Sequence, residues 1–325
     1  MEEVRWGIIG CGDVTEKKSG PAFQKIENSS LVAVMRRTGE LAQDYAQRHN
    51  VAKWYDRAED LINDPDVNAV YIATPPSTHK KYTVMAAEAG IPVYVEKPMA
   101  LNHSEAEEMI EVCKENNVQL NVAYYRRAMP RFLKIKELLE SGAIGELRTI
   151  NIRLAQPVEE SEKDETSLPW RVLPEIAGAG KFLDLGSHTL DLFDYYFGPI
   201  EKVHGLAVNQ AGYYPAEDNV AAVFRFANGI QGTGSWTFDG YHDLDQNEVI
   251  GTEGRLLFSS FNEEPIILEN KEGRKEIDFA YPEHVQQPLI KKVVLSLLGK
   301  GESPSTGETA ARTTRVMDEI IKEYY

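Results

Sequence analysis

The sequence predicts two domains: an α/β domain with a doubly wound parallel sheet over residues 1–125, and an α+β domain with a large, mostly antiparallel open sheet over residues 126–325. In the first part, short apolar segments alternate with segments of helical periodicity, as in parallel sheets covered by helices. After Pro130 the pattern changes to two-residue alternation, which is typical of strands with one exposed face. A chain of 325 residues is long enough to form two hydrophobic cores.

Five apolar segments are expected to form the parallel sheet, and the segments between them are expected to be helices. The predicted strands cover residues 4–10, 31–35, 69–73, 92–95 and 119–123. Apolar residues recur at spacings of three and four over 41–49, 79–89 and 104–116, and a further short helix is expected through Pro21 to Phe23. Ser104 and Glu107 predict a capping box at the start of the third of these helices.

The second domain is expected to begin with a helix over 131–140 and to continue as a sheet. Asn228 and Gly229 predict a type I′ turn that joins strands 219–226 and 230–237 into a hairpin. Further strands are expected over 149–154, 201–208, 246–250, 254–259 and 265–268, and helices near 285–298 and 308–323 are expected to close this domain.

Composition excludes several classes of protein. The formal net charge of −16 argues against binding to nucleic acid or to anionic membranes. No apolar segment is long enough to span a membrane, and the acidic amino terminus leads directly into a strand, so we expect no signal peptide and a cytoplasmic location. The two cysteines, Cys11 and Cys113, form neither a disulfide framework nor a metal motif.

A glycine turn follows the first strand. Gly10 can adopt the tight-turn conformation, and Gly12 lets a pyrophosphate approach the backbone where Asp13 and Val14 begin a helix. This arrangement predicts a Rossmann dinucleotide-binding turn, although Thr15 stands where glycine or alanine would allow the closest packing. The alternative is an ordinary glycine-rich turn.

The end of the second strand favours NADP(H) over NAD(H). An aspartate at this position would bind the ribose 2′-hydroxyl of NAD, but the sequence has Arg36, Arg37 and Thr38 there instead. Guanidinium groups match a phosphate with two parallel hydrogen bonds. NADP(H) is therefore the preferred cofactor and NAD(H) stays possible, since two solvated arginines would leave the choice open.

Polar residues follow the next three strands, at the edge of the sheet where ligands bind in open α/β folds. Lys97 is the most informative, because it ends an apolar strand and is followed by Pro98. The alternative for Lys97 is a strand-end lysine that only reaches solvent. The candidate residues are Thr74, Pro75 and His79 after the third strand, Glu96 and Lys97 after the fourth, and Tyr124 and Arg126 after the fifth.

Asp184 and His188 form a second candidate group. They lie in a glycine-rich entry to a helix and are expected one turn apart on the same face. Histidine exchanges protons near neutral pH, and a nearby carboxylate can orient it. The alternative is a capping aspartate with a histidine in the core. No metal site is expected, because no second histidine or cysteine lies at ligand spacing.

The loop 156–175, which carries Trp170 and Arg171, either covers this site or is simply solvated.

These motifs together resemble the glucose-fructose oxidoreductase, inositol dehydrogenase and MocA family. The resemblance rests on the glycine turn, Ala73-Thr74-Pro75 with His79, Glu96-Lys97-Pro98, Trp170-Arg171, and Asp184 with His188. It implies a Rossmann domain followed by an open-sheet domain, a cis bond before Pro98, and hydride transfer between NAD(P) and a sugar, polyol or related cyclic hydroxy or keto compound. Met35-Arg36-Arg37 is similar to the corresponding segment of the 1,5-anhydrofructose reductases and dihydrodiol dehydrogenases that use NADP. Thr15 and Arg36 are the departures from the family pattern.

The resemblance assigns a role to each candidate. Lys97, Asp184 and His188 would be catalytic; Gly10, Gly12, Asp13, Val14, Arg36, Arg37, Thr38, Thr74, Pro75, His79, Glu96 and Lys97 would bind the cofactor; Tyr124, Arg126, Trp170, Arg171, Asp184 and His188 would bind a carbohydrate-like substrate. Two alternatives stay open: a non-catalytic nucleotide-binding sensor, and an enzyme that uses tightly bound nucleotide without net redox. The substrate, the direction of reaction and the exact oligomeric state are not specified.

The resemblance also implies assembly through the second sheet, as a homodimer or homotetramer. A sheet covered by helices on one face leaves the other face to water or to a partner. We expect Trp236, Phe238 and Phe258 on that face, where a second copy of the chain would cover them.

Overall fold

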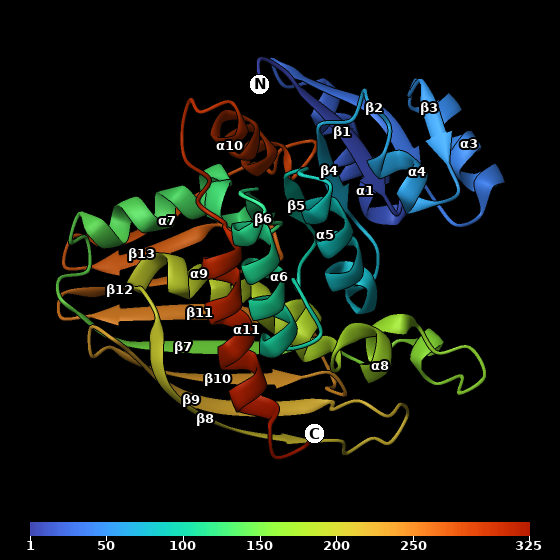
Figure 1. The fold of residues 1–325 in the computed structure, drawn as a ribbon. Helices are drawn as coiled ribbons and strands as arrows, with labels where there is room; N and C mark the ends of the chain where they lie inside the picture. Colours follow the sequence, from blue (N-terminus) through green and yellow to red (C-terminus); the bar gives the residue numbers. More distant parts are fainter. The chain divides into compact units, whose positions relative to one another are not determined.

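A computed structural model describes all 325 residues (Figure 1). The chain forms two compact units. The first unit contains Met1–Met129 and Pro282–Ala311, and the second contains Pro130–Tyr281 and Arg312–Tyr325. This division differs from the predicted boundary at residue 125, because α10 (Gln287–Leu297) belongs to the first unit and does not close the second. The reason is packing: Leu289, Ile290 and Val293 of α10 are buried in one core with Trp6 and Phe23.

The first unit contains a parallel sheet of six strands in the order β3-β2-β1-β4-β5-β6. The strands are β1 (Val4–Ile9), β2 (Ser29–Met35), β3 (Lys53–Tyr55), β4 (Ala69–Ile72), β5 (Val93–Val95) and β6 (Leu120–Val122). The five predicted strands are confirmed. Strand β3 was not predicted because it has three residues at the sheet edge and none of them is buried.

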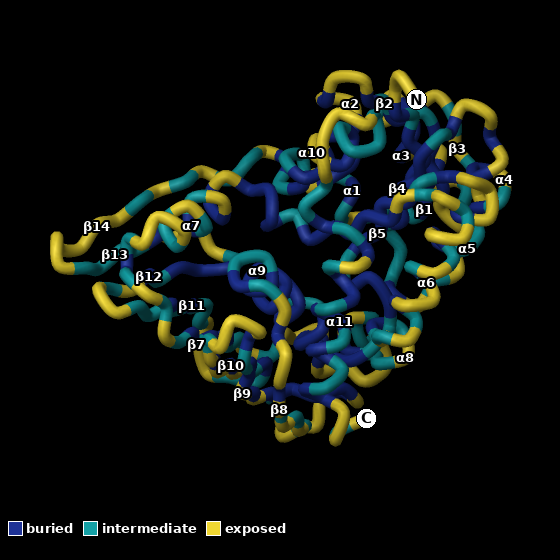
Figure 2. The backbone as a smooth tube through the Cα atoms, turned by 60° about the vertical axis from the view of Figure 1, so that its left-hand side comes forward, coloured by how far each residue is buried: buried dark blue, intermediate teal, exposed yellow.

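Helices on both faces bury this sheet, so β4 and β5 have no exposed residue (Figure 2). Successive strand residues point to opposite faces: Val70 and Ile72 enter one core cluster, whereas Tyr71 and Tyr94 enter the other. The helices are α1 (Asp13–Lys17), α2 (Gly20–Gln24), α3 (Gly39–Arg48), α4 (Ala58–Ile62), α5 (His79–Glu88), α6 (His103–Glu115) and α10. No helix in the chain is both long enough and apolar enough to cross a membrane.

The start of α6 corrects the predicted capping box. The cap is Asn102, whose side-chain oxygen accepts a hydrogen bond from the Glu105 backbone N–H at 3.0 Å. Ser104 and Glu107 lie inside the helix instead of at its cap. Asparagine caps a helix about as well as serine, and its position two residues earlier fixes where the helix begins.

The second unit contains an eight-stranded sheet in the order β14-β13-β12-β11-β7-β10-β9-β8, antiparallel except between β7 and β10. Its strands are β7 (Leu147–Ala155), β8 (Ile200–Val208), β9 (Asn219–Phe226), β10 (Gln231–Thr237), β11 (Leu244–Gly251), β12 (Gly254–Phe258), β13 (Ile266–Asn270) and β14 (Gly273–Ile277). The predicted strands are confirmed. Strand β14 was missed because it is a charged, exposed edge strand.

The hairpin of β9 and β10 is confirmed, but its turn is not of type I′. Gly229 has a φ of 90°, whereas Asn228 is not among the residues with positive φ. The Gly229 N–H donates to the Phe226 carbonyl at 2.9 Å. These features indicate a type I turn followed by a glycine bulge, the usual form of the slightly longer hairpin loop.

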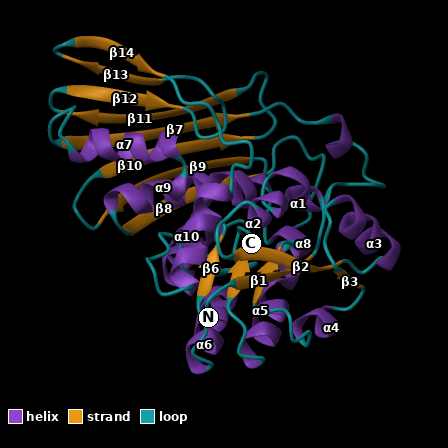
Figure 3. Ribbon diagram, turned by 90° about the horizontal axis from the view of Figure 1, so that it is seen from above, coloured by secondary structure: helices purple, strands orange, loops and turns teal.

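Helices α7 (Pro130–Glu140) and α9 (Ser187–Phe197) lie against one face of this sheet (Figure 3). Aromatic contacts join α9 to the strands beneath it: Phe193 lies 6.2 Å from Phe258, and Phe197 lies 5.4 Å from Phe226, between ring centroids. The last helix, α11 (Gly307–Ile321), contacts the same face, because its Ile320 lies against Gly205 of β8.

The expectation that Trp236, Phe238 and Phe258 lie on the open face is wrong. Trp236 and Phe238 have no exposed surface, and Phe258 is 3% exposed. Trp236 packs edge-to-face against Phe182 at 4.9 Å, so it belongs to the covered core. Alternation along β10 allows either set of alternate residues to face the core. The structure buries Gly232, Gly234 and Trp236, whereas Thr233 and Ser235 face outward.

The open face instead carries a ladder of polar side chains across six strands. It runs from Thr233 through Asn151, Glu248, Arg255 and Glu269 to Arg274, with neighbouring atoms 2.7–3.1 Å apart. Beside it, on β8 and β9, Leu206 and Val223 are 67% and 55% exposed. The open face therefore carries polar side chains from β10 to β14 and exposed aliphatic side chains on β8 and β9.

Candidate functional site

The glycine turn between β1 and α1 has the geometry that the sequence predicts. Gly10 has a φ of 92°, and a Cβ atom there would lie 2.7 Å from Thr74 Cγ2. The Gly10 and Cys11 N–H groups both donate to the Met35 carbonyl, at 2.9 and 3.1 Å. The conformation and the close approach of the chain after β4 both require glycine at position 10.

The turn also fits a dinucleotide. A Cβ atom on Gly12 would meet only the Gly10 carbonyl oxygen, at 4.0 Å, so the backbone is open to a ligand there. Asp13 and Val14 follow at the amino end of α1, where backbone N–H groups favour a phosphate. Thr15 closes the turn: its hydroxyl donates to the Gly12 carbonyl at 2.7 Å.

Arg36, Arg37 and Thr38 are exposed and lie between β2 and α3. Arg36 Nη1 lies 3.5 Å from the Cys11 carbonyl oxygen, which brings the guanidinium group to the glycine turn. An exposed cation beside this turn can bind the phosphate on an adenosine ribose. Thr38 is the N-cap residue of α3.

His79 connects two of the strand-end segments. Its Nδ1 lies 3.0 Å from the Pro98 carbonyl oxygen and its Nε2 lies 2.7 Å from the Thr74 carbonyl oxygen. The ring has no exposed surface, and burial lowers its pKa. His79 therefore holds the Thr74 and Pro98 segments together, and its predicted contact with the cofactor stays a prediction. The bond between Lys97 and Pro98 is cis, as the resemblance implies.

A buried hydrogen-bond network lies behind Lys97. The Tyr71 hydroxyl and Gln286 Nε2 donate to Glu96 Oε1 at 2.5 and 2.6 Å, and the Lys97 N–H donates to Glu96 Oε2 at 3.2 Å. Burial and the adjacent Glu96 raise the pKa of Tyr71 well above its ordinary value, so this hydroxyl stays a donor. Glu96 itself is buried, and its contacts fix the backbone that presents Lys97.

Tyr124 and Arg126 follow β6, and both are buried. The Arg126 guanidinium lies 4.9 Å from the centre of the Tyr125 ring. Their predicted contact with substrate stays a prediction. The residues that sequence reasoning missed in this unit are Tyr71 and Gln286, since neither stands in a motif and Gln286 is separated from Glu96 by 190 positions.

In the second unit, Asp184 lies in a π-helical turn, Phe182–Gly186, which leads into α9 with His188 in its first turn. We expected a regular helix over these residues. The structure has a π-helical turn at Phe182–Gly186 instead, so the prediction is wrong for that turn. A π turn adds one residue to the repeat and is frequent at functional sites. His188 is 5% exposed, and its ring lies edge-to-face with Phe261 at 5.8 Å.

The structure brings Trp170 and Arg171 to Asp184. Arg171 Nε donates to Asp184 Oδ2 at 3.1 Å, and its guanidinium lies 4.4 Å from the centre of the Trp170 ring. The loop 156–175 is ordered by short helices and by a capping box between Glu159 and Glu162, so it is not a plain solvated loop. A carboxylate, a guanidinium and an indole ring in one group suit the hydroxyl groups and apolar face of a small polar ligand.

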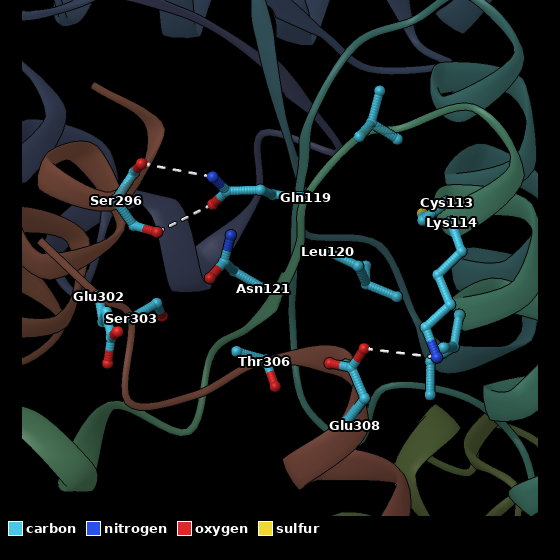
Figure 4. A pocket seen from close by; sticks show the side chains of 13 residues that line it. Cys113, Lys114, Gln119, Leu120, Asn121, Ser296, Glu302, Ser303, Thr306 and Glu308 are labelled. Carbon is cyan, nitrogen blue, oxygen red and sulfur yellow. Dashed lines mark hydrogen bonds and ion pairs between the residues drawn. The ribbon is translucent and has the colours of Figure 1, made fainter. Parts of the chain in front are cut away.

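A pocket of about 410 Å³ in the first unit lies elsewhere (Figure 4). It is lined by α6, β6, the end of α10 and the start of α11, and it contains none of the predicted site residues. Its polar groups pair with one another: Lys114 lies 3.7 Å from Glu308, and the Gln119 amide bonds Ser296. This pocket is therefore separate from the strand-end residues of the first unit, and it contains no residue of the second unit.

Two family models match the chain. Residues 4–124 match the NAD-binding Rossmann fold of an oxidoreductase family, and residues 132–257 match the GFO/IDH/MocA C-terminal domain. Among curated proteins, oxidoreductase P35 of Formosa agariphila is 43% identical over 318 residues, which cover 97% of each chain. The 1,5-anhydro-D-fructose reductase of Ensifer adhaerens is 27% identical over 94% of this chain and 91% of its own.

Solved structures show the same fold. A levoglucosan dehydrogenase in complex with NADH and levoglucosan superimposes with a TM-score of 0.89 and 22% identity, over 98% of this chain and 96% of its own. An aldose-aldose oxidoreductase from Caulobacter crescentus complexed with glycerol gives a TM-score of 0.86 at 22% identity, over 98% and 97%. At this identity the likeness concerns the fold alone.

Proposed function

Because the chain belongs to the GFO/IDH/MocA family of oxidoreductases, we propose that it transfers a hydride between NADP(H) and a sugar, a polyol or a related cyclic hydroxy or keto compound. The observation that carries the proposal is Lys97, held at a strand end by the Glu96 network in the unit whose glycine turn is open to a dinucleotide. Relatives named as a 1,5-anhydro-D-fructose reductase and a myo-inositol 2-dehydrogenase support the substrate class.

Each residue has a distinct role in this proposal. The bound nicotinamide ring supplies or accepts the hydride. In the oxidative direction, His188 takes the proton of the substrate hydroxyl as general base, and in reduction it returns that proton to the carbonyl oxygen. The positive charge of Lys97 stabilises the same oxygen as it becomes an alkoxide. Asp184, held by Arg171, binds other hydroxyl groups of the substrate.

NADP(H) is proposed as the preferred cofactor because Arg36 offers an exposed guanidinium beside the turn. NAD(H) is the alternative.

We also propose a homodimer or homotetramer formed through the open face of the second unit. Leu206 and Val223 support this assembly, since they are exposed on adjacent strands and a second copy of the chain would remove them from water.

The function is tested by following NADPH absorbance with aldoses, ketoses, inositols and dicarbonyls. On the best substrate, Lys97→Met and His188→Ala are each expected to lower turnover by roughly 10²- to 10⁴-fold, the usual loss for a missing acid or base. Nucleotide affinity should change little in His188→Ala, because the glycine turn and Arg36 supply that binding. If both variants keep turnover within about threefold of the parent, the two residues have structural roles only.

The two alternatives give different results in the same assay. A sensor would bind NADPH without turnover on any compound of the panel. An enzyme that uses the nucleotide without net redox would release bound nucleotide on denaturation and convert substrate with no net change in absorbance.

A further inference from the structure

Glu217 is a buried carboxylate that the proposed chemistry does not use. It has no exposed surface and lies just before β9. Its Oε1 and Oε2 both accept the Gly180 N–H, at 3.0 and 2.9 Å, and the Tyr325 hydroxyl donates to Oε2 at 2.6 Å. Three segments that are far apart in the sequence therefore meet at one carboxylate.

The Glu217 carboxylate contacts the segment that leads to Asp184 at Gly180. A Cβ atom on Gly180 would lie 2.7 Å from the Glu217 carbonyl oxygen and 3.0 Å from its Cδ, so the contact requires glycine. The Gly180 carbonyl accepts the Leu183 N–H at 3.1 Å, the first hydrogen bond of the turn that carries Asp184. Lys181, the N-cap of that turn, makes no side-chain capping bond.

Glu217 therefore takes the place of a local cap. An oxygen acceptor near the first peptides of a helix is favourable because N–H groups there lack partners within the helix. Here the acceptor is a carboxyl group from a distant segment, which bonds the Gly180 N–H just before the π turn. A rigid turn passes that placement on to Asp184 and to His188 in the next turn.

Tyr325 holds the carboxylate from the other side. Its neighbour Tyr324 donates instead to the Pro215 carbonyl at 3.0 Å, a hydrogen bond that does not involve Glu217. The two rings lie edge-to-face at 4.9 Å. The chain thus offers two adjacent tyrosines, of which one bonds the carboxylate and the other is a matched control.

We propose that Glu217 and Tyr325 are positioning residues for the π turn: Glu217 fixes the Gly180 amide, and through it Asp184 and His188, while the Tyr325 hydroxyl fixes the Glu217 carboxylate. The proposal rests on the proposed function, in which Asp184 and His188 contact the substrate. Neither Glu217 nor Tyr325 touches the reacting atoms.

The test compares Tyr325→Phe with Tyr324→Phe in the full-length protein. The first readout is the ring carbon NMR signal of His188 in protein with labelled histidine, assigned by its loss in His188→Ala. The second readout is kcat, KM and NADPH affinity on the substrate found above. Glu217→Gln is a third variant, since its amide oxygen can still accept the Gly180 N–H but it no longer provides two carboxylate oxygens.

Tyr325→Phe is expected to shift the His188 signal and to lower kcat roughly tenfold, because small displacements of catalytic groups have large effects on rate. NADPH affinity should stay within about twofold, since the glycine turn is unchanged. Glu217→Gln should shift the signal in the same way with a smaller loss of kcat. Tyr324→Phe should leave both readouts at the parent values.

The proposal is overturned if Tyr325→Phe gives the same His188 signal as Tyr324→Phe, or if it shifts the signal while kcat stays at the parent value. If no compound of the panel is turned over, the proposed function fails, and the NMR comparison alone decides whether this pair positions the turn. A shift in Tyr325→Phe without a shift in Tyr324→Phe would support it, and equal signals would refute it.

Discussion

At the scale of single residues, Lys97 depends on side chains that no sequence motif contains. The lysine itself is predictable, because it ends an apolar strand and precedes a proline. Its support is not, because Tyr71 reaches Glu96 from the adjacent strand β4 and Gln286 reaches it from the amino end of α10. A buried carboxylate needs such partners, since an unpaired charge in the interior is strongly unfavourable.

Arg36 is the residue whose substitution tests the cofactor. A charge-assisted hydrogen bond contributes about 1.5 to 3 kcal/mol, so Arg36→Ala should weaken NADPH binding by roughly 10- to 100-fold. NADH binding should change much less, because NADH lacks the 2′-phosphate. Dissociation constants for both nucleotides, measured by fluorescence titration, decide between the cofactors.

Arg57→Ala serves as the control for general loss of charge, since its side chain is exposed and pairs only weakly with Glu59 at 3.8 Å. Equal affinities for the two nucleotides in the parent protein, or an unchanged ratio in Arg36→Ala, would contradict the assignment.

At the scale of elements, the periodicity of apolar residues identifies most helices and strands. It does not show which residues of a strand face the core. Alternation along β10 predicts a strand with one buried face, yet residue types alone could not show that Gly232, Gly234 and Trp236 form that face. Gly232 and Gly234 lie where Phe224 and Trp236 rings occupy the space of a side chain. The π turn at Asp184 was also unpredictable, because the contact just before it joins Gly180 to Glu217, 37 positions away.

Glu217 gives this element a dependence on pH. Burial raises its pKa to about 7, above the ordinary value of 4.5, while the hydrogen bonds from Tyr325 and Gly180 oppose this shift. The folded state therefore binds this proton more tightly than the unfolded state. The stabilisation is fully present below pH 4.5 and is lost as pH rises through 7.

Glu217→Gln removes this titration. Relative to the parent, the free energy of unfolding of the variant should rise by about 3 kcal/mol between pH 4.5 and pH 8, from a shift of about 2.5 units. Urea unfolding at several pH values measures this difference, with Glu165→Gln as a control at an exposed carboxylate. A difference that stays constant across this range would show that Glu217 titrates normally.

At the scale of the whole molecule, the first unit is built from two separate segments of the chain. Residues 282–311 return to it and add Leu289, Ile290, Val293 and Val294 to a core that also contains Trp6. The sequence could not reveal this return, since α10 is apolar enough to complete either domain. Each buried side chain of this kind contributes about 1.5 to 3 kcal/mol.

A fragment of residues 1–129 is therefore expected not to fold cooperatively. Loss of four buried side chains removes roughly 6 to 12 kcal/mol, which is comparable to the entire stability of a typical domain. Joining residues 282–311 to the fragment through a flexible linker should restore a cooperative urea transition. A single sharp transition in the fragment alone would contradict the assignment of α10 to this core.

The open face of the second unit determines the expected assembly. From β10 to β14 it carries a polar ladder whose side chains already bond one another, so water or a matching polar surface can cover it equally well. Its edge is different: Leu206 and Val223 point to solvent from adjacent strands, and burying them against a twofold copy would be favourable.

Light scattering at micromolar concentration should give a mass that is a multiple of 36.5 kDa. The double variant Leu206→Lys, Val223→Lys should approach 36.5 kDa, whereas Leu133→Lys on α7 should not. A monomeric parent protein would exclude assembly through this face.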